Sequence, residues 1–226
     1  MKTNTEGEMD ILSKIDYSIL KATTTDEEVL RAAEETKKYG FATLCVFPKH
    51  IRTARIVLPE EKVCSVVAFP LSTVPTQLKV AEAIFSAEEG AGELDVVVDV
   101  GAVKAWNWKK VEDELLEIRN NLPNKVLKLI MECCYLTEEE KTTLCKLAIE
   151  TGWDLVKTST GYAPYGAQAS DVELLVKCSE GKIKVKAAGG IRDLPTAEKF
   201  IEIGAERIGT SSAVEIAKEV LYGREV

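Results

Sequence analysis

Three charged residues interrupt apolar segments of the chain in a way that points to chemistry. Lys157 lies within DLVKTSTG, Lys186 within IKVKAAGG and Asp95 within ELDVVVD. A charge on a strand that is buried on both faces costs free energy unless it is paired or takes part in function. We therefore take these three side chains as the candidate reacting groups.

Two lysines near each other favour amine chemistry with a carbonyl substrate. A second cation and partial burial both disfavour the charged form of a lysine. A neutral lysine attacks aldehydes and ketones to give a carbinolamine and then an iminium, or Schiff base. Lys184 shares its strand parity with Lys186, but Lys186 lies nearer the glycine pair that ends the segment. The pattern therefore favours Lys157 and Lys186, with Asp95 available to move protons.

The rest of the sequence excludes several other kinds of chemistry. His50 is the only histidine, whereas a metal triad needs several and a histidine-activated nucleophile needs its base oriented by a third group. The patterns GxxxxGK[ST] and GxGxxG are absent. We expect neither a metal nor a nucleotide cofactor, and we predict that His50 is a surface or capping residue.

Two glycine- and hydroxyl-rich segments predict a site for an anion. AGGIR at positions 188–192 follows one expected strand, and GTSS at 209–212 follows the next and begins the last helix. Glycines allow backbone N–H groups to approach an oxyanion, hydroxyls add donors, and a helix N-terminus adds a favourable dipole. Barrel enzymes commonly bind phosphate at these two loops, so we predict a phosphate group on the substrate.

The elements that position these residues alternate between short β-branched runs and helix patterns. We expect strands at 14–20, 42–47, 63–69, 94–100, 126–132, 154–158, 183–188 and 206–210. This βα alternation predicts an α/β fold, a parallel eight-stranded (β/α)8 TIM barrel spanning residues 1–226 as one domain, with residues 1–10 as a polar N-terminal segment. A doubly wound open sheet is the alternative, but the segment after the first expected strand lacks its usual glycines.

Composition and charge indicate a small-molecule enzyme. The chain has 226 residues with 29 Lys+Arg against 37 Asp+Glu, a net charge of −8, which argues against nucleic-acid or anionic-membrane partners. The N-terminus lacks the apolar core of a signal peptide, and no segment is long and apolar enough for a membrane span. We expect a cytoplasmic protein whose six cysteines remain reduced.

Several motifs together resemble those of deoxyribose-phosphate aldolases. They are VKTSTG at 156–161, VKAAGGIR at 185–192 and RIGTSS at 207–212, joined by KIDYSILK at 14–21, ELDVVVDVGAV at 93–103 and ECCYLTEEEK at 132–141. The resemblance covers nearly the whole chain. It implies a class I, metal-free and cofactor-free aldolase that reversibly splits 2-deoxy-D-ribose 5-phosphate into D-glyceraldehyde 3-phosphate and acetaldehyde. It also implies a homo-oligomer, a dimer or a tetramer.

The resemblance also implies roles for individual residues. Lys157 matches the Schiff-base lysine, Lys186 the lysine that perturbs it, and Asp95 the carboxylate of the proton relay. Asp16 and Cys45 match positions that line the pocket. The phosphate contacts map to Gly161, Gly189, Gly190, Arg192, Gly209, Ser211 and Ser212.

The chain departs from the family pattern in places, and other functions stay open at this point. Tyr17 stands where many members have histidine, and the ending LYGREV does not support carrying over to Tyr222 the role of the C-terminal tyrosine of some members. One alternative is a phosphosugar isomerase or epimerase on the same barrel, with Asp95 as the base. Another is a barrel that binds phosphate without catalysis.

Overall fold

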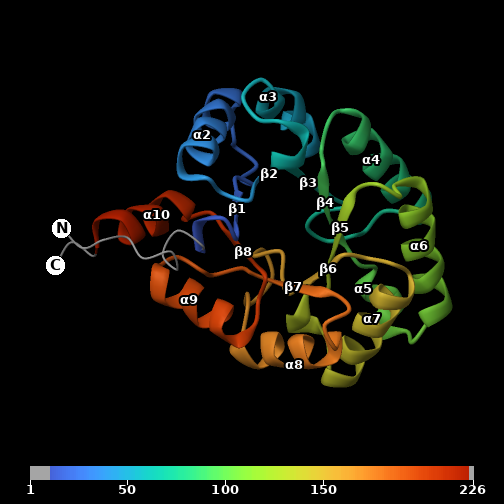
Figure 1. The fold of residues 1–226 in the computed structure, drawn as a ribbon. Coiled ribbons are helices and arrows are strands. Elements are labelled where there is room, and N and C mark those ends of the chain that lie inside the picture. The colour runs from blue at the N-terminus through green and yellow to red at the C-terminus, as the bar shows by residue number, and fades with distance from the viewer. Residues whose placement is uncertain (1–10, 224–226) are drawn as a thin grey trace.

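The structure is a computed structural model that describes residues 11–223, in which eight parallel strands close into a barrel (Figure 1). The ring closes because β1 pairs with β2 on one side and with β8 on the other, where Asp16 lies opposite Gly209. In chain order the strands are β1 (Ile15–Ser18), β2 (Thr43–Val46), β3 (Val63–Val67), β4 (Glu93–Val97), β5 (Val126–Ile130), β6 (Leu155–Lys157), β7 (Lys184–Ala188) and β8 (Arg207–Thr210).

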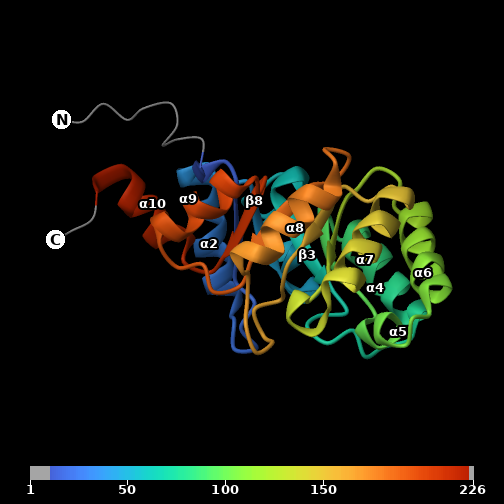
Figure 2. The same cartoon turned by 90° about the horizontal axis from the view of Figure 1, so that it is seen from below.

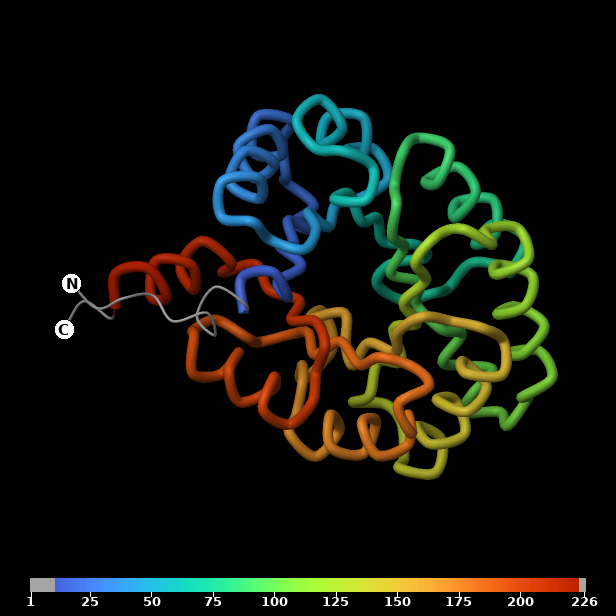
Figure 3. Tube along the Cα trace, viewed as in Figure 1, coloured from blue at the N-terminus to red at the C-terminus, as the bar shows by residue number. Residues whose placement is uncertain are grey.

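Helices surround the barrel, as the Cα trace shows (Figure 3). They are α2 (Asp26–Tyr39), α3 (Ile51–Arg55), α4 (Thr76–Glu88), α5 (Val100–Lys104), α6 (Trp108–Asn121), α7 (Glu138–Glu150), α8 (Ala169–Ser179), α9 (Leu194–Ile203) and α10 (Ala213–Tyr222). Short 3-10 helices span Pro48–His50, Glu60–Lys62 and Cys133–Tyr135. Seen from below, α10 packs beside α9 and α2 (Figure 2). Within residues 11–223 no helix has both the length and the apolar character needed to cross a lipid bilayer.

The helix ends follow local rules of the sequence. Thr25 and Thr137 each begin a helix with a capping box, in which the threonine hydroxyl and a glutamate three residues later satisfy each other's backbone N–H groups. Asp193 caps α9 and Pro195 lies in its first turn. Gly204 ends α9 in the left-handed conformation, with φ of 116°.

The expected (β/α)8 TIM barrel is confirmed, and the open doubly wound sheet is not the fold. Each of the eight expected strands is present, but all are shorter than predicted. The first, for example, spans Ile15–Ser18 rather than residues 14–20. The residues that were predicted as strand but lie outside it are mainly at the carboxyl ends. Apolar residues such as Ile19 and Leu20 follow the last residue of β1 and instead line the mouth of the barrel.

His50 does not lie on the surface, so that alternative is wrong; it stands at the N-cap position of α3, but its side chain makes no capping hydrogen bond there. Its side chain is buried, and Nδ1 lies 2.9 Å from Oδ1 of Asp26, the first residue of α2. Thr53 donates to the same oxygen at 3.0 Å. The histidine therefore links the segment after β2 to the start of α2 and lies outside the candidate reacting groups.

The two faces of the strands have opposite character. Residues that face the helices, such as Leu94, Val96 and Leu127, belong to one large apolar core. The alternate residues point into the barrel, and among them Asp95, Lys128 and Lys186 are fully buried. The core between barrel and helices is therefore apolar, whereas the inside of the barrel is highly charged.

Substituting Lys79, a buried lysine on helix α4, is expected to destabilise the fold. Lys79 of α4 donates to Glu114 of α6 and, at 2.9 Å, to the carbonyl of Val97. Lys79→Met leaves the Glu114 carboxylate buried without its cation, and we expect the free energy of unfolding to fall by about 3 kcal/mol or more. Urea titration measures this loss. The exposed Lys109, paired with Asp113, is the control, and Lys109→Met should cost less than about 1 kcal/mol. Equal costs would contradict the prediction.

Candidate active site

Asp95 lies at the centre of the charged interior of the barrel. Oδ2 of Asp95 accepts hydrogen bonds from Nζ of Lys157 and from Nζ of Lys186, each at 2.7 Å. Oδ1 accepts a third from Nζ of Lys128 at 2.9 Å. The backbone registers explain this convergence, because Asp95 is paired with Lys128 and Lys157 with Lys186 on adjacent strands. One carboxylate therefore holds three amines.

The cluster continues toward the opposite end of the barrel. Nζ of Lys186 lies 2.6 Å from Oδ2 of Asp16, and Nζ of Lys128 lies 2.6 Å from Oε2 of Glu93. Arg207 on β8 bridges both carboxylates, at 2.5 Å from Asp16 and 3.0 Å from Glu93. Four cations and three carboxylates thus form one connected network, which we call the barrel cluster: Asp16, Glu93, Asp95, Lys128, Lys157, Lys186 and Arg207.

Pairing within the barrel cluster outweighs the cost of burial. Burial alone would raise the pKa of Asp95, but Lys128, Lys157 and Lys186 hold that pKa well below its usual range. Burial alone would lower the pKa of Lys186, but the carboxylates of Asp16 and Asp95 raise it above its ordinary value. Lys186 and Asp95 are therefore charged at neutral pH, and each stabilises the ionised form of the other.

This geometry changes the expected relation between the two lysines. The sequence predicted that Lys186 acts on Lys157 as a neighbouring cation. The two amines are indeed close, but a carboxylate oxygen of Asp95 lies between them and accepts from both. The carboxylate that they share therefore offsets the effect of the Lys186 charge on Lys157.

A cavity of about 690 Å³ opens above the cluster at the carboxyl ends of the strands. Lys157 is the one member of the barrel cluster that lines it. Asp95 and Lys186 lie below its floor, and so do Asp16 and Cys45, which the resemblance placed along the pocket. Asp16 is turned away toward Arg207 and Lys186. A substrate in the cavity can thus touch the amine of Lys157 but not the carboxylate of Asp95.

The loops after β6, β7 and β8 form the other wall of the cavity. All the residues predicted to contact phosphate line it: Gly161, Gly189, Gly190, Arg192, Gly209, Ser211 and Ser212. Gly189 has φ of +93°, and a Cβ there would lie 2.8 Å from Cα of Gly166. These two loops can therefore approach each other only because both residues are glycine. The backbone and hydroxyl donors, with the start of α10, make this wall suited to an anion.

A buried contact that the sequence analysis did not single out supports the loop after β6. Glu132 adopts the left-handed conformation at the end of β5, with φ of 53°. Its carboxylate accepts from the backbone N–H of Thr160 at 3.1 Å and also from the Thr160 hydroxyl. Tyr162 then donates its hydroxyl to the carbonyl of Leu20 across the mouth, and its ring contacts Phe69 edge-on. The loop that follows Lys157 is therefore held in place at two points.

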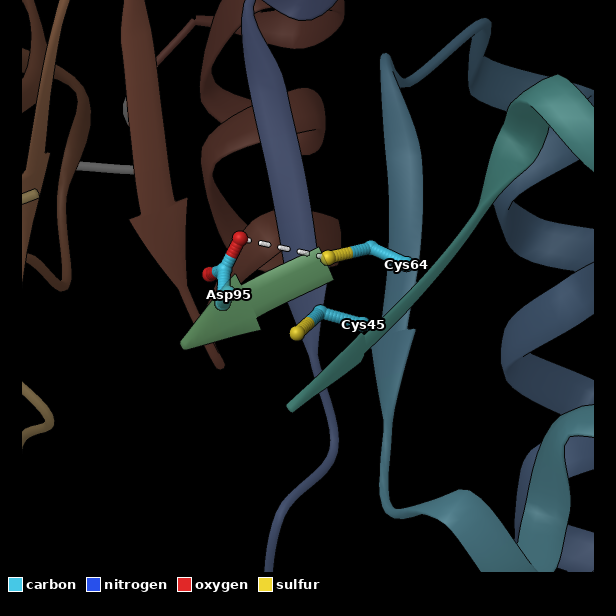
Figure 4. Close-up of side chains that lie close together, drawn as sticks. All are labelled: Cys45, Cys64 and Asp95. Atoms are coloured by element: carbon cyan, nitrogen blue, oxygen red, sulfur yellow. Dashed lines mark hydrogen bonds between the residues drawn. The ribbon is translucent and has the colours of Figure 1, made fainter. Parts of the chain in front are cut away.

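Cys45, Cys64 and Asp95 bring two sulfurs and a carboxylate oxygen within 4.8 Å of one another (Figure 4). Such a group has the donor types of a soft metal site. However, Cys64 donates to Oδ1 of Asp95 at 3.3 Å and accepts from Nζ of Lys128 at 3.3 Å. The positive charge that a metal would supply beside these atoms is already supplied by Lys128, so we assign no metal here.

Lys128 is the main member of the cluster that the sequence analysis missed. It lies in VLKLI, a charge inside an apolar strand, which is the same signal that singled out Lys157. Conversely, the structure separates Lys184 from Lys186. The Lys184 side chain is 64% exposed and lies near Glu206, whereas Lys186 is fully buried.

Comparisons with known proteins find similarity to aldolases along nearly the whole chain. Residues 10–224 match the model of the DeoC/LacD family of aldolases. The deoxyribose-phosphate aldolase of Thermococcus gammatolerans is 44% identical over 93% of this chain and 96% of its own length. That of Aquifex aeolicus is 42% identical over 94% of this chain and 97% of its own. A solved structure described as "QR15, an Aldolase" superposes with a TM-score of 0.91 at 42% identity, over 94% of this chain and 96% of that one.

Removing the charge of Asp95 should destabilise the protein in a pH-dependent way. Asp95→Asn leaves three buried amines without their shared carboxylate, and we expect a loss of about 3–5 kcal/mol of unfolding free energy at neutral pH. The folded-state pKa of Asp95 is depressed, so the wild-type advantage is fully present above the ordinary value of 3.8 and falls as the pH drops below it.

Urea unfolding at several pH values measures this difference. It should be constant from about pH 7 to about pH 5 and should narrow below about pH 4. Asp113→Asn, at an exposed carboxylate, controls for general acid sensitivity. A difference that does not change with pH would show that charge pairing is not what Asp95 contributes.

Proposed function

The chain belongs to the DeoC/LacD family of aldolases, and we propose that it reversibly cleaves 2-deoxy-D-ribose 5-phosphate into D-glyceraldehyde 3-phosphate and acetaldehyde through a Schiff base on Lys157. The observation that carries this proposal is the position of one amine. Lys157 is bound to a buried carboxylate on one side and opens on the other to a cavity whose wall carries glycines and hydroxyls suited to an anion. A carbonyl carbon and a phosphate can therefore be held by the same cavity.

The reaction begins at the aldehyde carbon C1 of the open-chain sugar. The neutral amine of Lys157 attacks C1, a C–N bond forms, and loss of water from the carbinolamine gives an iminium. The iminium draws electrons from the bond between C2 and C3. As the C3 hydroxyl loses its proton, this bond breaks, C3 becomes the aldehyde of glyceraldehyde 3-phosphate, and C2 remains on Lys157 as an enamine. Protonation of C2 and hydrolysis then release acetaldehyde.

Asp95 and Lys186 assist from beneath the cavity. The carboxylate of Asp95 contacts Nζ of Lys157, where it stabilises the iminium cation and relays protons, through a water molecule when the C3 hydroxyl is deprotonated. Lys186 remains charged and keeps Asp95 ionised. Proton transfer by a positioned group of this kind typically contributes about 10²- to 10⁴-fold to the rate.

The phosphosugar isomerase or epimerase with Asp95 as its base is less well supported. Asp95 is fully buried and does not line the cavity, so it cannot touch a substrate C–H bond. The membership in an aldolase family also favours carbon–carbon cleavage.

We also propose that the protein is a homo-oligomer, a dimer or a tetramer. A solved structure that is 31% identical, with a TM-score of 0.86 over 96% of this chain and 93% of that one, is described as a "unique tetrameric structure of deoxyribose phosphate aldolase from Aeropyrum pernix". Light scattering of the purified protein gives its mass in solution directly.

We further propose that the protein works in the cytoplasm. Within residues 11–223, all six cysteines are free, and Cys45 and Cys64 lie close together without a disulfide. Free thiols in this arrangement suit a reducing compartment.

Lys157→Ala should abolish essentially all turnover of deoxyribose 5-phosphate, because no other amine of the barrel cluster lines the cavity. A coupled assay for glyceraldehyde 3-phosphate measures this, and borohydride reduction with substrate should place a permanent mass increase on Lys157 of the wild type. Lys184→Ala is the matched control, because Lys184 is exposed on a neighbouring strand, and it should retain near-normal activity. Substantial turnover by Lys157→Ala, or reduction without an adduct, would refute the Schiff base.

Removing the phosphate from the substrate should weaken catalysis without preventing amine chemistry. Hydrogen bonds to a charged group contribute about 1.5–3 kcal/mol each, so kcat/KM for 2-deoxy-D-ribose should fall by about 10²-fold or more relative to its 5-phosphate. Acetaldehyde carries no phosphate, and borohydride reduction in its presence should still give an adduct on Lys157. Similar kcat/KM values for the two sugars would show that the predicted wall does not bind phosphate.

A further inference from the structure

Lys128, like Lys186, is a fully buried cation of the barrel cluster. Its side chain has no exposed surface, and its amine lies 2.6 Å from Glu93, 2.9 Å from Asp95 and 3.5 Å from Asp16. It also donates to Sγ of Cys64 at 3.3 Å. These partners come from β1, β3 and β4, while Lys128 itself lies on β5. These partners hold the amine in one position and stabilise its positive charge.

Lys128 does not touch the substrate cavity. It is absent from the cavity lining, and Asp95 lies between its amine and the amine of Lys157. Lys128 can therefore affect the reaction only without touching the substrate, through its charge and through its contact with Asp95.

The charges of the barrel cluster do not balance. Lys128, Lys157, Lys186 and Arg207 are four cations, whereas Asp16, Glu93 and Asp95 are three carboxylates. An excess positive charge in an interior of low dielectric is costly, and loss of one proton removes it. Lys157 contacts one carboxylate, which it shares with Lys186, and Lys157 alone opens to the cavity. It is therefore the amine of the barrel cluster that a substrate in the cavity can reach.

We propose that Lys128 is a positioning residue that makes Lys157 reactive by supplying the unbalanced positive charge of the barrel cluster. This inference rests on the proposed Schiff base at Lys157. Without Lys128 the remaining three cations would match the three carboxylates, and the proton of Lys157 would be held more tightly. Lys128 thereby sets the pH range in which the amine attacks the substrate.

The other ionisable groups around the two amines are few. Lys157 faces Asp95 from β4, with Lys186 on β7 beyond that carboxylate, and it interacts at longer range with Cys45 on β2 and Glu132 after β5. Lys128 faces Asp16, Cys64, Glu93 and Asp95, and it repels Lys186. Among these groups Glu93 contacts Lys128 and Arg207 but neither Lys157 nor Lys186, so it offers a second way to change the charge of the cluster.

Three variants test this charge effect. Lys128→Met removes the excess cation with a side chain of similar length. Glu93→Gln removes one negative charge and increases the excess. The double variant Lys128→Met/Glu93→Gln restores the wild-type excess of one positive charge although both side chains have changed.

The acid limb of the pH profile of kcat/KM should follow the charge of the cluster. We expect Lys128→Met to move this limb to higher pH by about one unit or more, and Glu93→Gln to move it to lower pH. The limb of the double variant should return to near the wild-type position. A merely structural role for Lys128 would lower activity in both variants that lack it and would not produce opposite shifts that cancel.

A second readout separates this inference from the proposed function. A 1,3-diketone condenses with a neutral lysine amine to a vinylogous amide with loss of water, and the ultraviolet absorption of this product reports the reaction without any aldol chemistry. Mass spectrometry should identify Lys157 as the modified residue. The pH at which this reaction begins should be highest in Lys128→Met, lowest in Glu93→Gln, and intermediate in the wild type and the double variant. Circular dichroism confirms that each variant is folded.

The outcomes are distinct. Opposite shifts in the single variants and a restored limb in the double variant support the inference. Coincident limbs in all four proteins, with the borohydride adduct still formed on Lys157, overturn the role of Lys128 and leave the proposed function intact. Absence of that adduct in the wild type refutes the proposed function and this inference with it. If Lys128→Met does not fold, the shift of Glu93→Gln alone decides, and no shift overturns the inference.

Discussion

The carboxylate of Asp95 is the interaction on which the interior of this barrel depends, because three amines from three different strands donate to its two oxygens. Each of these amines would be costly to bury alone. Their convergence fixes the side chains of β5, β6 and β7 relative to β4. It also leaves a single opening, since only Lys157 contacts both the carboxylate and the cavity. The charge pairing that stabilises the barrel is therefore the same pairing that positions the candidate nucleophile.

In this closed parallel barrel, the strands and the loops contribute different parts of the site. Side chains inside the barrel hold charge away from water, whereas the loops at the carboxyl ends of the strands provide backbone donors for an anion. Gly189 and Gly166 allow two of these loops to meet at a distance that a side chain would prevent. The amine and the wall of glycine and hydroxyl residues thus belong to different elements and are aligned because all eight strands run in the same direction.

Much of this arrangement could be predicted, and the missing part has a physical reason. A charge in an apolar strand identified Lys157, Lys186 and Asp95, and the strand registers place them together. The same signal was present at Lys128, but its meaning depends on which carboxylates lie opposite it. Asp16 and Arg207 are 191 positions apart and meet only because β1 pairs with β8. A local pattern shows that a charge is buried, whereas the closed ring determines its partners.

The sharing of Asp95 also gives a different account of how the amine reacts than direct crowding of two lysines. In the proposed mechanism, an ammonium and an iminium at Lys157 carry the same charge, so the contact with Asp95 suits both of these states. The neutral amine lies between these states, and at that stage the four cations have become three and match the three carboxylates. With one excess positive charge in the interior, the contact with Asp95 stabilises the ammonium and the iminium. The neutral amine is favoured because its formation makes the numbers of cations and carboxylates equal. Neither a lone buried lysine nor a fully balanced cluster would favour both.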